Sequence, residues 1–417
     1  ITIMALAVIV AIFVPIFVKD SSFSNNYIRF VFLLFALNSS ISYFFSYRRS
    51  LFYANQREYV NTIIDFIMKL IKHILQITVL LVFKNFTAFL IVNIIVTFIN
   101  NVFIYIKSKK EYPEINLKEA KRNRKAEKEV INSVKSLSIV QVLTSLNSFT
   151  DNILISSLIN ITTAGLYTNY YLIITELNRV IITIYNGVGA SIGNLIAEGK
   201  KGKIKEIFTN IDYLSFFIGS FCCISLYIIM EPFVNIWLGN EYLLPNMCLL
   251  ILAINFYLVV IKQPLIYFLK NSGNFKSLII PMALECVLNL IISIILAINI
   301  GLIGILIGTL VSSIISYMLI IRKISATFEL EKGSLIRDQI LFAFITCIEL
   351  ILFKFIANHI AVSNIWLNLI ISAIICLLLP NIISILILKK SKKLDYLRRV
   401  SMSFLERFKG KKHEKNS

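Results

Sequence analysis

Charged side chains are scarce in this chain of 417 residues, and metal-binding side chains are scarcer still. Asp, Glu, Lys and Arg make up 16% of the chain, against about 25% in soluble domains. The three histidines (His73, His359 and His413) are far apart, and none of the six cysteines forms a C-x-x-C pair. This composition excludes an ordinary soluble enzyme and argues against a metal site or a disulfide framework.

Motifs for nucleotide chemistry and for catalysis are also missing. The sequence has no G-x-x-x-x-G-K-[ST] phosphate-binding loop, and no triad spacing or paired-carboxylate loop stands out. The close glycines of GLIGILIGTL at 301–310 lie inside an apolar run, where helix packing explains them better than a nucleotide fingerprint does. We therefore predict a protein that is not an enzyme and that has no resident cofactor.

The chain is instead rich in long apolar runs. Apolar residues make up 57% of it, and its mean hydropathy is +0.79. About 20 apolar residues in a row cross a bilayer as a helix, because lipid offers no partners for free backbone N–H and C=O groups. The sequence thus predicts an all-α, polytopic membrane protein with about twelve spans. The spans lie near 1–18, 28–46, 60–83, 87–106, 136–157, 164–196, 207–230, 244–269, 277–298, 301–321, 339–357 and 365–388.

The net charge of +19 follows the predicted topology. Of the 42 Lys and Arg residues, 34 fall in alternate loops and in the C-terminal tail, and the loops between them are nearly free of bases. By the positive-inside rule, the basic loops and the C-terminus are cytoplasmic. The excess charge therefore indicates orientation and attraction to anionic lipids, and not nucleic-acid binding.

A weak internal repeat organises the chain. Apolar spans, polar loops and basic ends recur at an offset of about 217 residues, as in Ala36-Leu37-Asn38 and Ala253-Ile254-Asn255. A six-span second unit then implies that the first unit began before Ile1, so the intact protein would have 14 helices. The predicted divisions are an N-lobe of four helices that lacks its first two (1–107), a cytoplasmic linker (108–134), a C-lobe of six helices (135–323), two additional helices (338–388) and a basic cytoplasmic tail (389–417).

Three segments carry a family resemblance: FTDNILISSLINITTAGLYTNYYLI at 149–173, GASIGNLIAEGK at 189–200 and EPFVNIWLGNEYLLP at 231–245. With the two-lobe topology, they make the chain resemble the multidrug/oligosaccharidyl-lipid/polysaccharide exporter superfamily. Within it, the chain is most similar to the bacterial O-antigen and capsule repeat-unit flippases (Wzx type). The resemblance implies a MATE-like fold of two pseudo-symmetric lobes in the bacterial plasma membrane.

Such proteins, the resemblance implies, move an undecaprenyl-pyrophosphate-linked oligosaccharide from the cytoplasmic to the outer leaflet by alternating access between the lobes. The implied partners are this lipid-linked glycan, membrane lipids, and the polymerase and glycosyltransferases of the same pathway. The sequence does not decide whether an ion, H⁺ or Na⁺, drives the transport. Two alternatives remain: an ion-coupled multidrug antiporter of the same fold, or a non-transporting scaffold of the polysaccharide machinery.

Ionisable groups inside spans are costly, so they mark candidate sites. Along 60–83, one helical face carries Asp65, Lys69, Lys72, His73 and Gln76. This stripe predicts a cationic cavity wall for the pyrophosphate. The alternative is an internal Asp65–Lys69 pair with the lysines snorkelling to the membrane surface.

The span at 164–196 repeats the pattern with Asn169, Glu176, Arg179 and Asn186. Arg179 is suited to phosphate because its planar fork binds two oxygens at once. Its alternative role is a structural pair with Glu176, one turn away.

Two further spans carry polar groups. Asp151, near the outer end of 136–157, is predicted either to bind a coupling proton or sodium ion or to cap or pair with a nearby cation. The Asn, Ser and Thr side chains around it suit a glycan, although such stripes also bind helices to each other. Lys262 joins the candidate substrate site, beside a kink expected at Pro264, and another kink is expected at Pro281. Glu349 and Lys354 are expected to form a structural pair outside the site.

Overall fold

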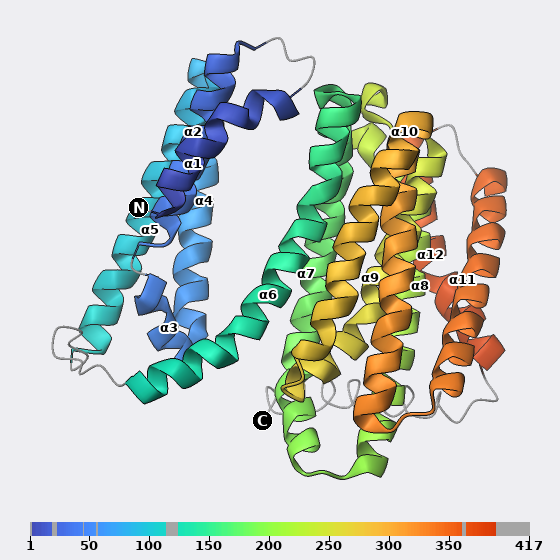
Figure 1. Ribbon diagram of the computed structural model, residues 1–417. Coiled ribbons are helices and arrows are strands. Elements are labelled where there is room, and N and C mark those ends of the chain that lie inside the picture. The colour runs from blue at the N-terminus through green and yellow to red at the C-terminus, as the bar shows by residue number, and fades with distance from the viewer. Residues whose placement is uncertain are drawn as a thin grey trace, which may run out of the picture. The chain divides into compact units, whose positions relative to one another are not determined.

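The computed structural model confirms the predicted class, since the regular structure of the described residues is entirely helical (Figure 1). The chain forms two compact units, Ile1–Lys128 and Glu129–Ser417, called unit 1 and unit 2 below. The predicted basic tail and positions 114–123 of the predicted linker lie outside the described residues. The residues that the structure describes are 2–18, 23–44, 46–55, 57–113, 124–360 and 364–388.

Unit 1 is built around the antiparallel pair α4 and α5. Lys84 ends α4 in the left-handed region, and the Asn85 side chain then caps α5 by accepting from the amide of Thr87 at 2.8 Å. The long helix α2 and the short α3 pack against α5. Described elements of unit 1 are α1 (Thr2–Phe13), η1 (Val14–Phe17), α2 (Asn25–Ser42), α3 (Ser46–Ala54), α4 (Glu58–Phe83) and α5 (Phe86–Glu111).

The first predicted basic loop is itself helical and turns its arginines into unit 1. It forms α3, where Arg48 is buried with its guanidinium 5.5 Å from the ring centres of both Tyr47 and Tyr105. Arg57, which follows α3, pairs with Glu111 at 2.7 Å. These bases were expected to mark topology and to attract lipid, but they also hold the helix ends of unit 1 together.

Unit 2 has its core on α8 and α9, which pack against each other and against neighbours on several sides. About two thirds of the span in each is buried, against 11% in α4. Its described elements are α6 (Arg124–Leu154), the π-helical turn η2 (Ile155–Ile159), α7 (Ile161–Ala197), α8 (Lys201–Trp237), η3 (Asn240–Tyr242), α9 (Asn246–Asn271), α10 (Lys276–Phe328), α11 (Lys332–Ile360) and α12 (Ile365–Leu388).

The helix α11 is attached to α8 through both apolar and polar contacts. Phe342 stacks on Phe216 with ring centres 4.4 Å apart. Glu349, which is fully buried, accepts a hydrogen bond from Ser220, and Lys354 lies over the ring of Tyr227. The structure thus gives Glu349 and Lys354 separate partners on α8, where the sequence had suggested a pair between them.

The helix α10 is two spans joined at a sharp break. The backbone leaves helical geometry at Ile300 and Gly301, between the predicted spans 277–298 and 301–321. Pro281 lies inside the first half, and the kink expected there stays a prediction. Gly304 and Gly308 let the second half lie directly on the first, since a Cβ at Gly308 would lie within 2.2 Å of the Ser293 hydroxyl. This close packing is the helix-packing role predicted for the glycines of 301–310.

The break also supports the 217-residue repeat. Lys84 and Gly301 are 217 positions apart, and both have positive φ, at 47° and 57°. Shifted by the same amount, α4 and α5 coincide with the first and second halves of α10. The hairpin that ends unit 1 therefore has a counterpart of the same length in unit 2.

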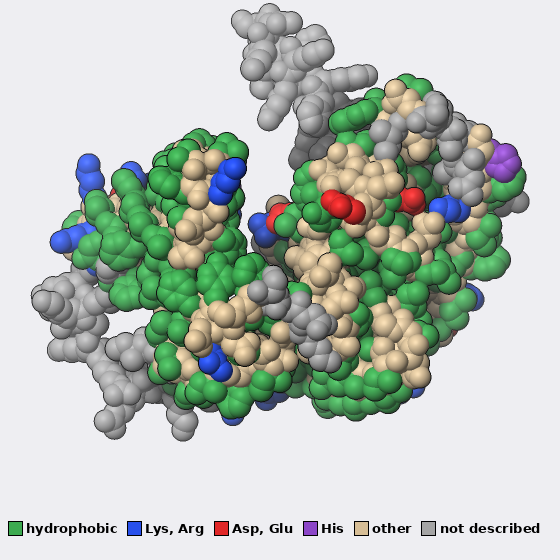
Figure 2. All heavy atoms as spheres, turned by 90° about the horizontal axis from the view of Figure 1, so that it is seen from above, with side chains coloured by type: hydrophobic (Ala, Val, Ile, Leu, Met, Phe, Trp, Pro, Cys, Tyr) green, Lys and Arg blue, Asp and Glu red, His purple; other side chains and the backbone are tan. Residues whose placement is uncertain are grey.

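The twelve predicted spans all fall on helices, but fewer pass a strict test. By length and composition, six described helices can cross a membrane, or seven if the bent pair α2–α3 is one span. The number falls because α10 holds two predicted spans, because only shorter apolar helices are found at Ile3–Phe17 and Trp366–Leu377, and because α2, α6 and α7 do not pass on their own. Figure 2 shows the hydrophobic side chains that cover much of the exposed surface, as expected for helices that face lipid.

Candidate functional site

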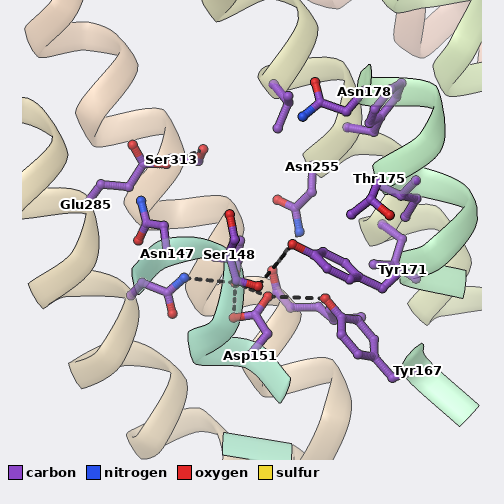
Figure 3. A pocket seen from close by; sticks show the side chains of 17 residues that line it. Asn147, Ser148, Asp151, Tyr167, Tyr171, Thr175, Asn178, Asn255, Glu285 and Ser313 are labelled. Carbon is purple, nitrogen blue, oxygen red and sulfur yellow. Dashed lines mark hydrogen bonds between the residues drawn. The ribbon is translucent and has the colours of Figure 1, made fainter. Parts of the chain in front are cut away.

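A polar cavity of about 180 Å³ lies inside unit 2, between α6, α7, α9 and α10 (Figure 3). It is unusual for a membrane-spanning bundle because amide, hydroxyl and carboxyl groups dominate one side of it. Its polar lining comprises Asn147, Ser148, Asp151, Tyr167, Tyr171, Thr175, Asn178, Asn255, Glu285, Asn289, Thr309 and Ser313.

Asp151 lies at one end of this cavity, 7% exposed, and its partners are neutral. The Thr309 hydroxyl lies 2.9 and 3.0 Å from the two carboxylate oxygens, and the Tyr167 hydroxyl lies 3.5 Å from one of them (Figure 3). No cation pairs with Asp151 among the described residues. The expectation of a cationic partner is therefore wrong, because hydroxyl groups from α7 and α10 take that place.

Next to Asp151, a series of hydrogen bonds links the two halves of α10. The Asn289 amide donates to the Thr309 hydroxyl at 3.1 Å. The Ser293 hydroxyl lies 3.1 Å from both the Asn289 amide oxygen and the Ile305 carbonyl. The close approach at Gly308 makes these contacts possible, so one carboxylate, three further side-chain oxygens and a backbone carbonyl gather within a small region.

A buried ion pair borders the cavity. The Lys262 ammonium donates to Glu285 at 2.8 Å and to the Ser313 hydroxyl at 2.7 Å, and Ser313 donates to Glu285 at 2.9 Å. Lys262 is 6% exposed and does not itself line the cavity, whereas Glu285 and Ser313 do. Its charge is thus engaged by Glu285. The pairing was missed because the two residues are on separate spans, and only their similar depth hinted at it.

The candidate residues of α7 lie away from this cavity. Arg179 and Glu176 are both exposed and form an ion pair at 3.2 Å, as the structural alternative described. Asn186 accepts a hydrogen bond from the Tyr267 hydroxyl at 2.7 Å, and Asn169 is half-buried. The helix contributes different residues to the cavity, namely Tyr167, Tyr171, Thr175 and Asn178.

In the polar stripe of α4, some side chains bind other residues of unit 1 and others are exposed. Asp65 pairs with Arg49 of α3 through two contacts of 2.9 Å and accepts from the Asn100 amide at 2.8 Å. Lys69 and His73 are exposed, Lys72 is half-buried, and Gln76 is buried near the Phe89 carbonyl. The alternative of an Asp65–Lys69 contact pair is therefore wrong. Sequence reasoning missed Arg49 because it was assigned to a cytoplasmic loop.

A family comparison identifies the chain. The model of a family described as "Polysaccharide biosynthesis protein" matches residues 1–247, more than half of the sequence. The chain belongs to this polysaccharide biosynthesis protein family. No curated protein matches it.

A solved structure agrees on the fold. The lipid II flippase MurJ, in an inward closed conformation, is 14% identical to this polysaccharide biosynthesis protein, with a TM-score of 0.65. The alignment covers 93% of this chain and 81% of that one. At this identity the likeness shows a shared fold, and the predicted exporter-superfamily fold is confirmed.

Proposed function

We propose that this protein is a flippase for undecaprenyl-pyrophosphate-linked oligosaccharides in the bacterial plasma membrane. It moves repeat units for capsule, O-antigen or exopolysaccharide to the outer leaflet by alternating access, alongside the polymerase and glycosyltransferases of that pathway. Membership of a polysaccharide biosynthesis family and the fold shared with a lipid II flippase support this proposal.

The observation that carries the proposal is the polar cavity inside the membrane helices of unit 2. Amide, hydroxyl and carboxyl groups are costly within a bilayer, so they are expected to face a substrate path or one another. Here twelve such side chains line one partly open space. A hydrophilic head group that must cross the bilayer needs such a surface in place of water.

The pyrophosphate is assigned to cations outside this cavity. Lys69 and Lys72 have no ion-pair partner among the described residues of α4 and its neighbours, and His73 and Gln76 extend the same stripe. In unit 2 the corresponding role falls to Arg179, with Glu176 paired to it and Asn169 and Asn186 further along the same helix. Lys262 has a different task, which is to hold Glu285 in place.

Asp151 is assigned to ion coupling. Its carboxylate and the oxygens of Thr309, Asn289 and Ile305 are hard donors of the type that Na⁺ or a proton prefers. A proton or a sodium ion at Asp151 would change the contacts between α6 and the two halves of α10. This change links ion binding to movement of the helices that form the cavity.

A multidrug antiporter of the same fold is the second candidate. Two carboxylates, Asp151 and Glu285, line the cavity, and an acidic cavity suits a cationic drug. The pairing of Glu285 with Lys262 leaves one of these charges compensated. A non-transporting scaffold, the third possibility, has no need of a polar cavity.

Deletion of the gene tests the function. A flippase predicts that lipid-linked oligosaccharide accumulates in deletion cells and that polymer export stops, while resistance to cationic dyes stays unchanged. Complementation with the full chain restores export. Unchanged lipid-linked sugar with increased dye sensitivity would favour the antiporter, and loss of polymer without accumulated lipid-linked sugar would favour the scaffold.

The proposed orientation has its own test. In a background without the six native cysteines, a cysteine at position 85 is expected to react with an impermeant reagent added outside intact cells. A cysteine at position 120 is expected to react only after permeabilisation, because the basic loops and the C-terminus are cytoplasmic. The reverse pattern of labelling would overturn the orientation.

A further inference from the structure

The cavity of unit 2 contains hydrogen-bond acceptors that the protein leaves without partners. The side-chain oxygens of Asn147, Asn178 and Asn255 are buried and accept no hydrogen bond from the described residues. All three residues line the cavity, and they come from α6, α7 and α9 respectively (Figure 3). In this conformation each of these oxygens is closed off even from water, and rotation of its amide towards the space would let it accept a hydrogen bond from a donor-rich ligand.

The surrounding groups show what kind of donor fits. The lining includes the hydroxyls of Ser148, Thr175 and Tyr171, which donate to backbone carbonyls and whose oxygens can still accept from a ligand. Tyr171 and Tyr167 stack with ring centres 5.7 Å apart, and Tyr171 is tied to the Ser148 carbonyl at 3.0 Å. Several neutral acceptors, hydroxyls and a fixed aromatic wall form a surface that suits the hydroxyl and amide N–H groups of a sugar ring.

The charge of the lining excludes an anion. Among the residues that line this described cavity, Asp151 and Glu285 are acidic and none is basic. The nearby Lys262 is engaged by Glu285 and Ser313, so it offers no free positive charge. A uronic acid or a pyrophosphate would therefore meet the Asp151 carboxylate and find no unpaired cation in the lining, at a cost that low dielectric increases.

The size of the cavity favours a small ligand. Its volume of about 180 Å³ is below the range of about 300–1,000 Å³ for pockets that hold drug-sized ligands. Because the cavity is partly open, one sugar ring can lie in it while the rest of a repeat unit extends outside.

We propose that Asn147, Asn178 and Asn255 form a subsite for one neutral or N-acetylated sugar ring of the translocated glycan, and that this subsite disfavours acidic sugars. The inference rests on the proposed flippase function and deepens it, because it separates recognition of the sugar in unit 2 from recognition of the pyrophosphate. Asn178 is the best probe of the subsite, since its side chain makes no hydrogen bond with any described residue. Asn255 also donates to the Leu306 carbonyl, so its loss would disturb packing.

Saturation-transfer NMR on the purified full chain tests the subsite. The probes are methyl N-acetylglucosaminide, sodium glucuronate and the cationic dye ethidium, each with wild type, Asn178→Ala, Asn147→Ala and the control Asn299→Ala. Asn299 is an exposed asparagine at the end of the first half of α10 that bonds only within its own helix. The acetamido sugar is expected to bind wild type and Asn299→Ala equally.

Loss of one hydrogen bond is expected to weaken binding of the acetamido sugar about three- to tenfold in Asn178→Ala and in Asn147→Ala. Glucuronate is expected to bind wild type at least as weakly as the acetamido sugar binds these variants. Equal binding of glucuronate, absence of sugar binding by wild type, displacement of the sugar by ethidium, or unchanged binding in both variants would overturn the subsite. Lipid translocation is measured separately, so a chain that binds sugar but moves no lipid would overturn the flippase function alone.

Discussion

Units 1 and 2 each contain an ion pair between helices that a third polar side chain joins by a hydrogen bond. In unit 1, Arg49 binds Asp65, and Asn100 joins them. In unit 2, Lys262 binds Glu285, and Ser313 joins them. Shifted by the 217-residue repeat, Arg49, Asp65 and Asn100 fall at positions 266, 282 and 317, each within about one helical turn of its counterpart.

The difference between the two networks lies in their exposure and in what surrounds them. The side chains of Arg49 and Asp65 are 28% and 32% exposed, whereas those of Lys262 and Glu285 are 8% and 13% exposed. Among the described residues, Lys69 and Lys72 of α4 have no ion pair, and in unit 2 three asparagines line a cavity. The ion pairs link helices in both units, and the difference supports the proposal that an anion binds in unit 1 and a neutral group in unit 2.

Replacing both Lys69 and Lys72 with Gln is expected to have the largest effect. The double variant removes the open cations of unit 1, so polymer export should stop while the amount of protein in the membrane stays normal. The matched control is Lys109→Gln with Lys110→Gln, at the exposed end of α5. Normal export by the α4 double variant would contradict the assignment of the pyrophosphate to unit 1.

Breaking each ion pair in turn compares how much the two pairs contribute to the free energy of unfolding. Lys262→Met leaves Glu285 buried and unpaired, which costs about 3–5 kcal/mol. Arg49→Met should cost less, on the order of 1–2 kcal/mol, because Asp65 is partly exposed and keeps its hydrogen bond to Asn100. Thermal unfolding in detergent measures both.

An apolar double variant checks the cause of that loss. Lys262→Met combined with Glu285→Leu removes both charges, and it should recover most of the stability that Lys262→Met loses. Equal losses for Lys262→Met and Arg49→Met, or no recovery in the double variant, would show that burial does not distinguish the two networks.

Asp151→Asn is expected to uncouple transport from ions without unfolding unit 2. The amide can still accept from Thr309, so packing is kept, while the ionisable group is lost. Translocation in vesicles should lose its dependence on a Na⁺ or H⁺ gradient and fall about tenfold or more, on the scale of groups that act directly in transfer steps. The control Asp212→Asn changes a buried acid of unit 2 that binds Gln339 outside the cavity, and it should keep the dependence.

Glu285→Gln should have the smallest effect on transport: it lowers stability because it leaves Lys262 buried without its ion pair, and it also changes the selectivity of the cavity. The substitution gives Lys262 a neutral partner, so the cavity of unit 2 repels an anion less strongly. Binding of glucuronate is expected to rise about three- to tenfold, the range of one modest polar interaction. Unchanged discrimination against glucuronate would show that the carboxylates do not set the preference of unit 2 for neutral sugars.

The sequence was sufficient for the fold because apolar runs and alternating loop charge both follow from the membrane. Hydrophobic length alone placed every span on a helix and separated 277–298 from 301–321, which is where α10 breaks at Ile300 and Gly301. Asp151 and Lys262 were also found from sequence, since ionisable groups in spans are rare.

The partners of these residues were not predictable from one sequence. Asp151 meets Thr309 across 158 residues, and Lys262 meets Glu285 across 23, in a geometry that only helix packing defines. Asn178 and Asn255 were missed because single amides in apolar helices give no pattern, and their meaning appears only when they surround one space. Arg49 was missed because the positive-inside rule explained it already.

Lipid translocation by the purified chain tests the central claim most directly. Liposomes containing the full protein and undecaprenyl-pyrophosphate-linked N-acetylglucosamine are treated with an impermeant lectin or enzyme that reads the sugar in the outer leaflet. We predict that the wild-type chain makes inner-leaflet lipid accessible, and that the variant with Lys69→Gln and Lys72→Gln does not. Accessibility no faster than in protein-free liposomes would contradict the account.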